Sequence, residues 1–416
     1  MNGSSHFGLL INPRQGTPGV VVLPPGGFRR AKAAITAWPG YQPTPLHDLS
    51  RIADEAGVAT IRLKNEASRF GLGSFKALGG AYAVANLLTA ELSRRGMALP
   101  AGVAGPGTDD LTDGRYADQT AAITVTCATD GNHGRSVAWG AQRFRCRCVI
   151  FVHATVSQGR VDAIAGFGAA VVRVAGNYDD AVREADRQAK TNGWFVVSDT
   201  SYPGYTEVPR DVMQGYRLMA DEAADQWTGP PPTHVFIQAG VGGAAASVSV
   251  QMRARFDPAP LLIVVEPERA ACLFESARAG TVSAVHGDLA TIMAGLACGE
   301  PSMLAWQELE RAAGAFMSIS DEAAVRSLCR LADDGVAIGE SGVAGLAGLL
   351  LTAADPSARA ALHLTGGSRI LLFGTEGVTD PAMYQEFYAH DRVNGSSTSC
   401  GILCLVVDGE ISGRLR

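Results

Sequence analysis

Residues 67–82 read ASRFGLGSFKALGGAY. Lys76 follows a Gly73-Ser74 turn and precedes an apolar helix of small residues, and residues 59–64 have the pattern of a strand that leads into this turn. An amine buried among apolar groups has a lowered pKa, which exposes the lone pair needed for a Schiff base. A single lysine more often packs its stem on a helix and extends its head into water. The role of Lys76 therefore depends on the motifs that accompany it.

Length and composition indicate a globular protein with a small-molecule site. The chain has 416 residues, of which 47% are hydrophobic and 18% are charged, enough for two domains with their own cores. The net charge is -6, which disfavours nucleic acid and anionic membrane surfaces as partners. We find neither an apolar run long enough to span a bilayer nor a signal peptide in residues 1–24, so a cytoplasmic location is expected.

Cysteine usage gives no indication of a metal site. The 8 cysteines are scattered over the chain, and none forms a Cys-x-x-Cys pair that would suggest zinc or dithiol exchange. Most are expected to behave as small buried hydrophobic residues.

Strand and helix patterns alternate along most of the chain, which predicts parallel sheets with helices on both faces. The expected strands include residues 121–127, 148–152, 170–174, 194–197, 234–238, 261–265 and 370–373. Residues 1–45 are expected to form an arm with short strands possible around residues 19–23, and residues 97–119 a surface insertion. The stretch after Arg392 is expected to be a tail with one apolar run, residues 402–407.

A glycine loop, Gly240-Val241-Gly242-Gly243, stands between an apolar strand and a helix. Bare amides at a helix N-terminus bind phosphate, although a tight strand-to-helix turn has the same sequence pattern. The loop also fits a relaxed dinucleotide motif that continues to Ala245, with Glu266 placed for a ribose. A nicotinamide-dependent oxidoreductase is therefore an alternative.

The turn Asp130-Gly131-Asn132-His133-Gly134 and Lys76 are left unexplained by a dinucleotide. A phosphorylated aldehyde cofactor would use both, because Lys76 would hold its aldehyde carbon and Asn132 could hydrogen-bond its ring hydroxyl. Asp130 could equally be a helix N-cap, and His133 a packed residue.

In this order, Ser74-Phe75-Lys76, the Gly131-Asn132-His133-Gly134 turn and the glycine loop resemble the fold type II, or tryptophan synthase β, class of pyridoxal-phosphate enzymes. Over roughly residues 42–388 the chain more closely resembles the diaminopropionate ammonia-lyase family. Further matching motifs are Arg69-Phe70-Gly71-Leu72, Asn177-Tyr178-Asp179-Asp180, Asp199-Thr200 and Gly374-Thr375-Glu376-Gly377.

This resemblance implies an α/β fold of two unequal domains with pyridoxal 5'-phosphate in the cleft between them, usually in a homodimer. We expect residues 1–79 and 201–416 to form the large domain and residues 80–200 the small one. By the same resemblance, Lys76 would carry the cofactor as a Schiff base and Asn132 would contact the ring hydroxyl. Gly240, Gly242 and Gly243 would bind the phosphate, and Thr375 would face the ring nitrogen.

The expected reaction is elimination of ammonia from 2,3-diaminopropionate, a small amino acid, to give pyruvate and two ammonia. Asp130 is expected to remove the Cα proton and Asp199 to hold the substrate's amine, because a cationic β-amine favours carboxylates. A serine or threonine dehydratase, a β-replacing synthase and a catalytically silent amino-acid-binding regulator remain alternatives. The resemblance also suggests that Cys272 and Cys298 face each other, although free thiols are favoured in the cytoplasm.

Overall fold

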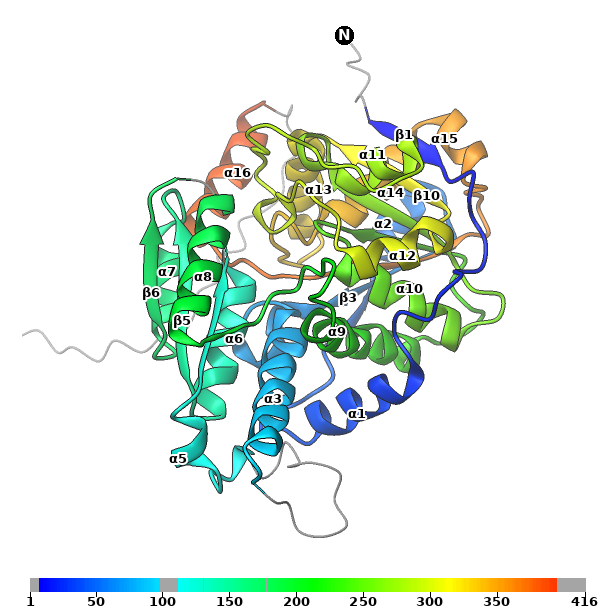
Figure 1. Cartoon of the computed structure of the whole chain (residues 1–416). Coiled ribbons are helices and arrows are strands. Elements are labelled where there is room, and N and C mark those ends of the chain that lie inside the picture. Colours follow the sequence, from blue (N-terminus) through cyan, green and yellow to red (C-terminus); the bar gives the residue numbers. More distant parts are fainter. Residues whose placement is uncertain (1–6, 98–110, 130, 177, 395–416) are drawn as a thin grey trace, which may run out of the picture.

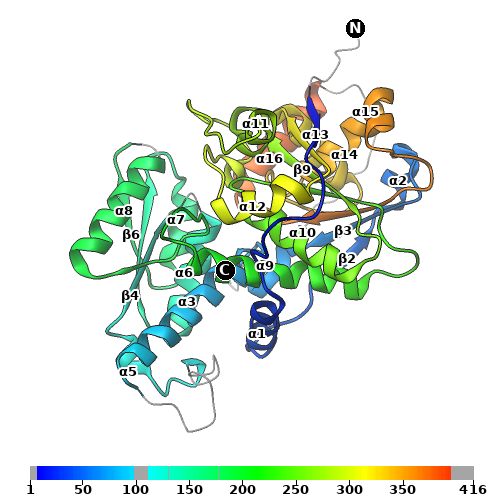
Figure 2. The same ribbon diagram turned by 45° about the vertical axis from the view of Figure 1, so that its right-hand side comes forward.

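A computed structural model describes residues 7–97, 111–129, 131–176 and 178–394. The molecule has two lobes, which are separated most clearly in Figure 2. The smaller lobe, coloured cyan to green, carries β4 to β7, and the larger lobe carries the remaining strands.

Within the described residues, seven strands form the sheet of the larger lobe, in the order β1-β10-β9-β8-β11-β3-β2. The five inner strands are parallel, whereas β1 and β2 pair antiparallel at the two edges. The strands are β1 (Gly8–Ile11), β2 (Leu46–Asp48), β3 (Thr60–Asn65), β8 (His234–Gln238), β9 (Leu261–Pro267), β10 (Ala315–Ile319) and β11 (Arg369–Gly374).

The smaller lobe contains a parallel sheet of four described strands in the order β6-β5-β4-β7. These strands are β4 (Thr124–Ala128), β5 (Arg147–His153), β6 (Ala170–Val174) and β7 (Phe195–Val196). The predicted α/β fold with two unequal, mainly parallel sheets is therefore confirmed, while the precise domain limits stay a prediction.

Helices cover both faces of the larger sheet, and the burial of successive strand residues shows why. In β8, Val235 and Ile237 belong to one apolar core, and Phe236 between them belongs to another. Alternate side chains of a strand point to opposite faces, so a strand with consecutive apolar residues at its centre must be covered on both. The first core continues into the smaller lobe through Val125 and Ile150.

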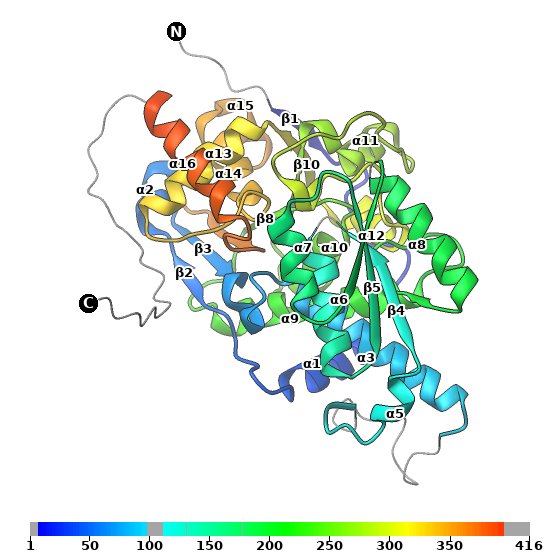
Figure 3. The ribbon, with the colours of Figure 1, turned by 90° about the vertical axis from the view of Figure 1, so that its left-hand side faces the viewer.

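Helices α3 and α9 lie side by side between the lobes (Figure 1), and α16 lies beside α13 (Figure 3). The helices are α1 (Pro25–Thr36), α2 (Ser50–Ala56), η1 (Glu66–Gly71), α3 (Lys76–Arg94), α5 (Ala117–Thr120), α6 (Asn132–Arg143), α7 (Gln158–Ala165), α8 (Tyr178–Asn192), α9 (Glu207–Gln226), α10 (Gly243–Arg255), η2 (Glu268–Ala270), α11 (Cys272–Ala279), η3 (Ala294–Leu296), α12 (Met303–Ala312), α13 (Asp321–Asp333), α14 (Ala344–Ala354), α15 (Pro356–Ala361) and α16 (Pro381–Asn394). None of those described has the length and apolar character that crossing a membrane requires.

The N-terminal arm differs from the sequence-based expectation. The prediction of a strand around residues 19–23 is wrong. Val20 and Val21 are exposed and pair with no strand among the described residues. The arm instead contributes β1, which pairs with β10, a strand that the sequence pattern did not reveal, and helix α1. Most of the expected insertion (98–110) and the apolar run of the tail lie outside the described residues.

Candidate active site

Lys76 is the first residue of α3 and forms a close ion pair with Asp199, which follows β7. The distance from Lys76 Nζ to Asp199 Oδ2 is 2.6 Å, and the two side chains are 19% and 16% exposed. Burial alone would lower the pKa of Lys76, but the Asp199 carboxylate outweighs it and the pKa is raised. The expected lowering of this pKa is therefore wrong in this structure, because the sequence did not reveal how close the carboxylate lies.

Buried charges fix the turn that leads to Lys76. Arg69 Nε donates to Glu66 at 2.8 Å and Arg69 Nη2 donates to Glu222 at 2.7 Å, while Lys64 Nζ contacts Glu222 at 2.7 Å. All four side chains are at most 5% exposed. A buried charge that lost its partner would be costly, so these pairs hold η1 in one position relative to α9.

His133 supports Asp199 from the start of α6. Its Nε2 lies 2.8 Å from the carbonyl oxygen of Val197 and so acts as the donor, while its Nδ1 lies 3.8 Å from Asp199 Oδ2. Burial by itself would raise the pKa of Asp199. The nearby charge of Lys76, and to a smaller extent that of His133, outweighs burial, and the pKa is lowered. Asp199 is therefore ionised and already holds an alkylammonium group.

The glycine loop connects β8 to α10 at the carboxyl edge of the larger sheet. Gly242 has φ of 95°, a left-handed conformation that favours glycine. A Cβ at Gly240 would lie 3.0 Å from Cys298 Sγ, and one at Gly243 would lie 3.8 Å from the carbonyl oxygen of Asp199. The loop thus borders the Lys76–Asp199 pair and presents the N-terminus of a 13-residue helix to it.

Thr375 follows β11 and is 4% exposed. Its Oγ1 accepts a hydrogen bond of 2.7 Å from Gln238 Nε2, the last residue of β8. Because the Thr375 oxygen accepts this hydrogen bond, its O–H proton remains free to be donated. An unprotonated ring nitrogen needs such a donor as its partner.

Asn132 and two glutamates form a further cluster that the sequence analysis missed. Asn132 Nδ2 donates a short hydrogen bond to Glu376, whose other oxygen accepts from the Ser341 amide at 3.0 Å. Burial raises the pKa of Glu376, and burial together with the neighbouring Glu376 charge raises the pKa of Glu340 to about 7. Arg160 on α7 bridges the two lobes by contacting Glu340 at 3.1 Å. The two glutamates lie in the glycine-flanked sequences 339–342 and 374–377. This flanking is the sequence feature by which they could have been recognised as site residues.

The surroundings of Lys76 fit pyridoxal phosphate. Within the described ranges, two buried polar atoms beside the Lys76–Asp199 pair have no hydrogen-bond partner in the protein: Tyr216 Oη and His133 Nδ1. Buried polar groups normally have partners, so these atoms suit a polar group bound between Lys76 and the glycine loop.

The roles predicted for Asp130 and for the pair Cys272 and Cys298 stay predictions. Asp130 lies outside the described residues, so its role as base stays a prediction. Cys272 Sγ lies 3.7 Å from the carbonyl oxygen of Gly240, and Cys298 borders the same glycine. Neither forms a disulfide in the described part of the chain, and a bridge between them also stays a prediction.

Glu266 is not available for a ribose. It is fully buried, and its two oxygens accept hydrogen bonds from the amides of Leu273 and Phe274 at 2.8 and 2.7 Å. The carboxylate therefore caps the start of α11, and the dinucleotide alternative loses the residue on which it depended.

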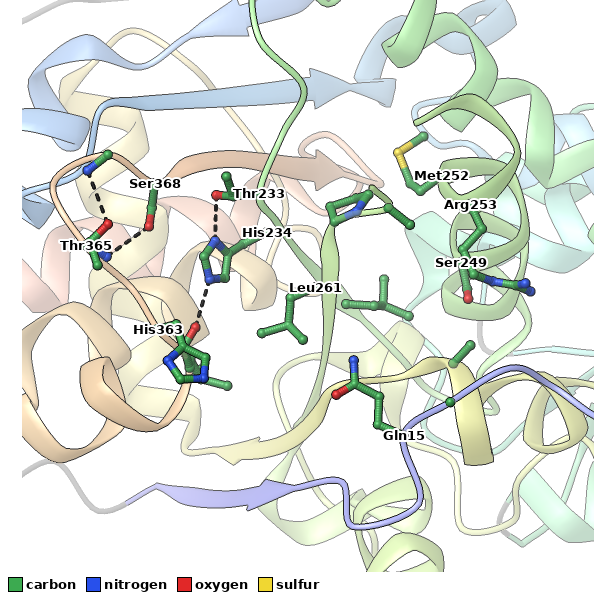
Figure 4. A pocket seen from close by; sticks show the side chains of 17 residues that line it. Gln15, Thr233, His234, Ser249, Met252, Arg253, Leu261, His363, Thr365 and Ser368 are labelled. Atoms are coloured by element: carbon green, nitrogen blue, oxygen red, sulfur yellow. Dashed lines mark hydrogen bonds between the residues drawn. The ribbon is translucent and has the colours of Figure 1, made fainter. Parts of the chain in front are cut away.

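A cavity of about 640 Å³ lies at the opposite edge of the larger sheet, where β8 and β9 begin (Figure 4). Its lining includes Gln15, Thr233, His234, Arg253 and Leu261, and none of the predicted site residues. His234 is satisfied by Thr233 and by the carbonyl oxygen of Leu362. Sites of open α/β sheets lie at the carboxyl ends of strands, which favours the surroundings of Lys76 over this cavity as the candidate active site.

The two-lobed fold, the lysine at the start of a helix and the glycine loop together define the class of fold type II pyridoxal-phosphate enzymes. The sequence model of the family described as "Pyridoxal-phosphate dependent enzyme" matches residues 37–375. Diaminopropionate ammonia-lyase of Escherichia coli (strain K12) is 40% identical over 358 residues, covering 83% of this chain and 87% of the relative. The chain therefore belongs to the diaminopropionate ammonia-lyase family of these enzymes.

Solved structures agree with this assignment. The crystal structure of holo diaminopropionate ammonia-lyase from Escherichia coli has a TM-score of 0.84 at 35% identity and covers 94% of this chain and 98% of its own. The complex of the same enzyme with D-serine has a TM-score of 0.84 at 34% identity, with the same coverage.

Proposed function

We propose that the chain eliminates ammonia from 2,3-diaminopropionate with the help of pyridoxal phosphate, converting the substrate and one water to pyruvate and two ammonia. The observation that carries the proposal is the contact of Lys76 with Asp199, because a carboxylate that holds one alkylammonium in the site can hold the substrate's ammonium in its place. The membership of the chain in the diaminopropionate ammonia-lyase family supports the choice of substrate.

The cofactor would be held at four points. Lys76 would bind its aldehyde carbon, the amides of Gly240, Gly242 and Gly243 its phosphate, and Asn132 its ring hydroxyl. Thr375 would donate to the ring nitrogen, because its oxygen already accepts from Gln238. When bound, the cofactor supplies an electron sink for the charge left at Cα, and a neutral ring partner keeps this sink weak, which suits prompt elimination.

The chain's own residues would then move protons and hold charges. Asp130 would accept the proton from Cα, and Asp199 would bind the β-ammonium, so that the nitrogen leaves protonated as ammonia rather than as an amide anion. His133 would lie beside this carboxylate, with its Nδ1 3.8 Å from Asp199 Oδ2.

The proposal is tested with purified protein supplied with pyridoxal phosphate. Pyruvate and ammonia are measured from D- and L-2,3-diaminopropionate, and from serine and threonine in parallel. Two ammonia for each pyruvate from diaminopropionate are expected. Pyruvate from serine with none from either diaminopropionate enantiomer would instead establish the dehydratase alternative.

A cytoplasmic homodimer completes the proposal. Its support is the resemblance of the chain to this enzyme class, in which homodimers are usual. Light scattering after size-exclusion chromatography measures the mass directly, and a monomer of 43.3 kDa would contradict the dimer.

A further inference from the structure

Tyr216 on α9 is a buried phenol with no structural hydrogen bond. The residue is 1% exposed, and its hydroxyl has no hydrogen-bond partner among the described residues. The ring centroid lies 5.5 Å from Lys76 Nζ and 4.5 Å from the ring of Phe75. A buried hydroxyl without a partner is unfavourable for folding, so we expect its partner to be a group that moves or binds beside Lys76.

The packing of α3 against α9 brings the phenol to the lysine. A Cβ at Gly79 would lie 2.4 Å from Tyr216 Cε1, and a Cβ at Gly215 would lie 2.0 Å from the carbonyl oxygen of Leu78. Glycine inside a helix costs stability relative to alanine. Each of the two helices has such a glycine where they cross. The absence of side chains there allows Tyr216 to pack against the first turn of α3.

The charges around Tyr216 keep it a neutral phenol. Burial and the nearby Asp199 carboxylate raise its pKa, although the charge of Lys76 and the approach of its amine to the hydroxyl oppose them; the approach falls short of a well-formed hydrogen bond. A neutral phenol can donate to the lone pair of an amine or accept from an ammonium, so it can serve Lys76 in either protonation state.

A substrate ammonium that took the same Asp199 oxygen as Lys76 would displace the lysine from it. One oxygen, Oδ2, lies 2.6 Å from Lys76 and faces His133 as well. If this carboxylate binds the substrate's ammonium, as the proposed function requires, the amine of Lys76 loses its partner at the step where it leaves the cofactor.

We propose that Tyr216 is a positioning residue for Lys76: its hydroxyl hydrogen-bonds to the lysine amine whenever Asp199 is engaged elsewhere, and so holds this amine ready to return to the cofactor. The inference rests on the proposed function for the role of Asp199. Asp199 and Tyr216 are thus alternative partners of one amine.

The test compares Tyr216→Phe with Tyr82→Phe. Tyr82 is also a buried phenol, on α3, but its hydroxyl pairs with Asn86 and not with the lysine. We expect Tyr216→Phe to lower kcat on diaminopropionate about tenfold with KM within about twofold, the scale of one lost hydrogen bond to a charged group. Its apo-protein should melt at the wild-type temperature or above. Tyr82→Phe should show the reverse, with wild-type kcat and a lower melting temperature.

A second readout needs no substrate. The rate at which added pyridoxal phosphate becomes attached to Lys76 is followed by absorbance and by borohydride trapping. Tyr216→Phe should change this rate less than about twofold in the wild-type background, and about tenfold in an Asp199→Asn background, where the tyrosine is the remaining partner.

Equal effects of Tyr216→Phe on attachment in the two backgrounds would overturn the inference. A melting temperature lowered as in Tyr82→Phe, with activity lost in proportion, would also overturn it by showing a structural role. If the wild-type protein makes no pyruvate from diaminopropionate, the proposed function fails, but the attachment rates still decide whether Tyr216 positions Lys76.

Discussion

Asp199→Asn is the substitution that most directly tests how the site works. It keeps the shape of the side chain and removes the charge that pairs with Lys76 at 2.6 Å. Because both side chains are mostly buried, the pair is weakened little by solvent, and a charged hydrogen bond of this kind contributes about 1.5–3 kcal/mol. A change of 1.4 kcal/mol corresponds to a factor of ten in an equilibrium constant. Loss of the ion pair should therefore raise the fraction of neutral Lys76 amine in the apo-protein about tenfold to a hundredfold.

The assay measures this fraction by chemical labelling. A trace of an amine-selective acylating reagent is added to apo-protein at mildly alkaline pH, and mass spectrometry gives the labelling of each lysine. Lys76 should label about ten times faster or more in Asp199→Asn. Burial favours the neutral amine, so the pKa of Lys76 should fall once the carboxylate is gone.

The chain contains a matched control on α8. Lys190 pairs with Asp186 at 2.5 Å, but the two side chains are 76% and 46% exposed. Exposed pairs contribute little, so Lys190 should label at nearly the same rate in Asp186→Asn and in the wild type.

Turnover of diaminopropionate should fall at the same time. We expect Asp199→Asn to lose about a hundredfold or more in kcat/KM, since the substrate's ammonium loses its carboxylate. Unchanged labelling of Lys76, or unchanged turnover of both enantiomers, would refute the view that Asp199 controls ammonium groups in this site.

Four further substitutions test other parts of the site. Lys76→Ala should leave the fold intact and abolish covalent attachment of the cofactor, as peptide mapping after borohydride reduction would show; attachment at another lysine would contradict the assignment. Asp130→Asn should lower turnover of at least one diaminopropionate enantiomer about a hundredfold while cofactor binding survives, whereas unchanged rates would make this residue only a helix cap. Gly242→Ala, at φ of 95°, should lower the free energy of unfolding by about 1–3 kcal/mol and weaken cofactor binding in a titration, while Gly159→Ala, in open space on α7, should do neither. Glu340 has a pKa raised to about 7 and stays protonated in the folded state at pH values where it ionises in the unfolded chain, so its contribution to stability is lost as the pH rises through 7. Glu340→Gln should remove this loss, which builds up between the ordinary carboxyl pKa and about pH 7 and reaches about 3 kcal/mol, and urea unfolding at about pH 4 and at about pH 8 measures it.

The local pattern of the sequence was enough to predict the elements that carry the site. Strands β6 and β8 were predicted with the limits that the structure has. For β8 the reason is that a parallel strand buried on both faces has a continuous apolar centre. The Lys76 turn and the glycine loop were also recognisable, because their residue types follow from the backbone and chemistry required at those positions.

Elements held mainly by distant partners were not predictable. Strand β1 was missed because its four residues are stabilised by pairing with β10, some 300 positions away. The protonation of the site was likewise decided by the tertiary structure. Lys76 and Asp199 are 123 residues apart in sequence, and only the folding of the smaller lobe against α3 places their charges 2.6 Å from each other. Sequence alone thus singled out the lysine that we propose holds the cofactor, whereas its charge depends on a neighbour that only the folded chain provides, because electrostatic energies are set by distance in space and by burial.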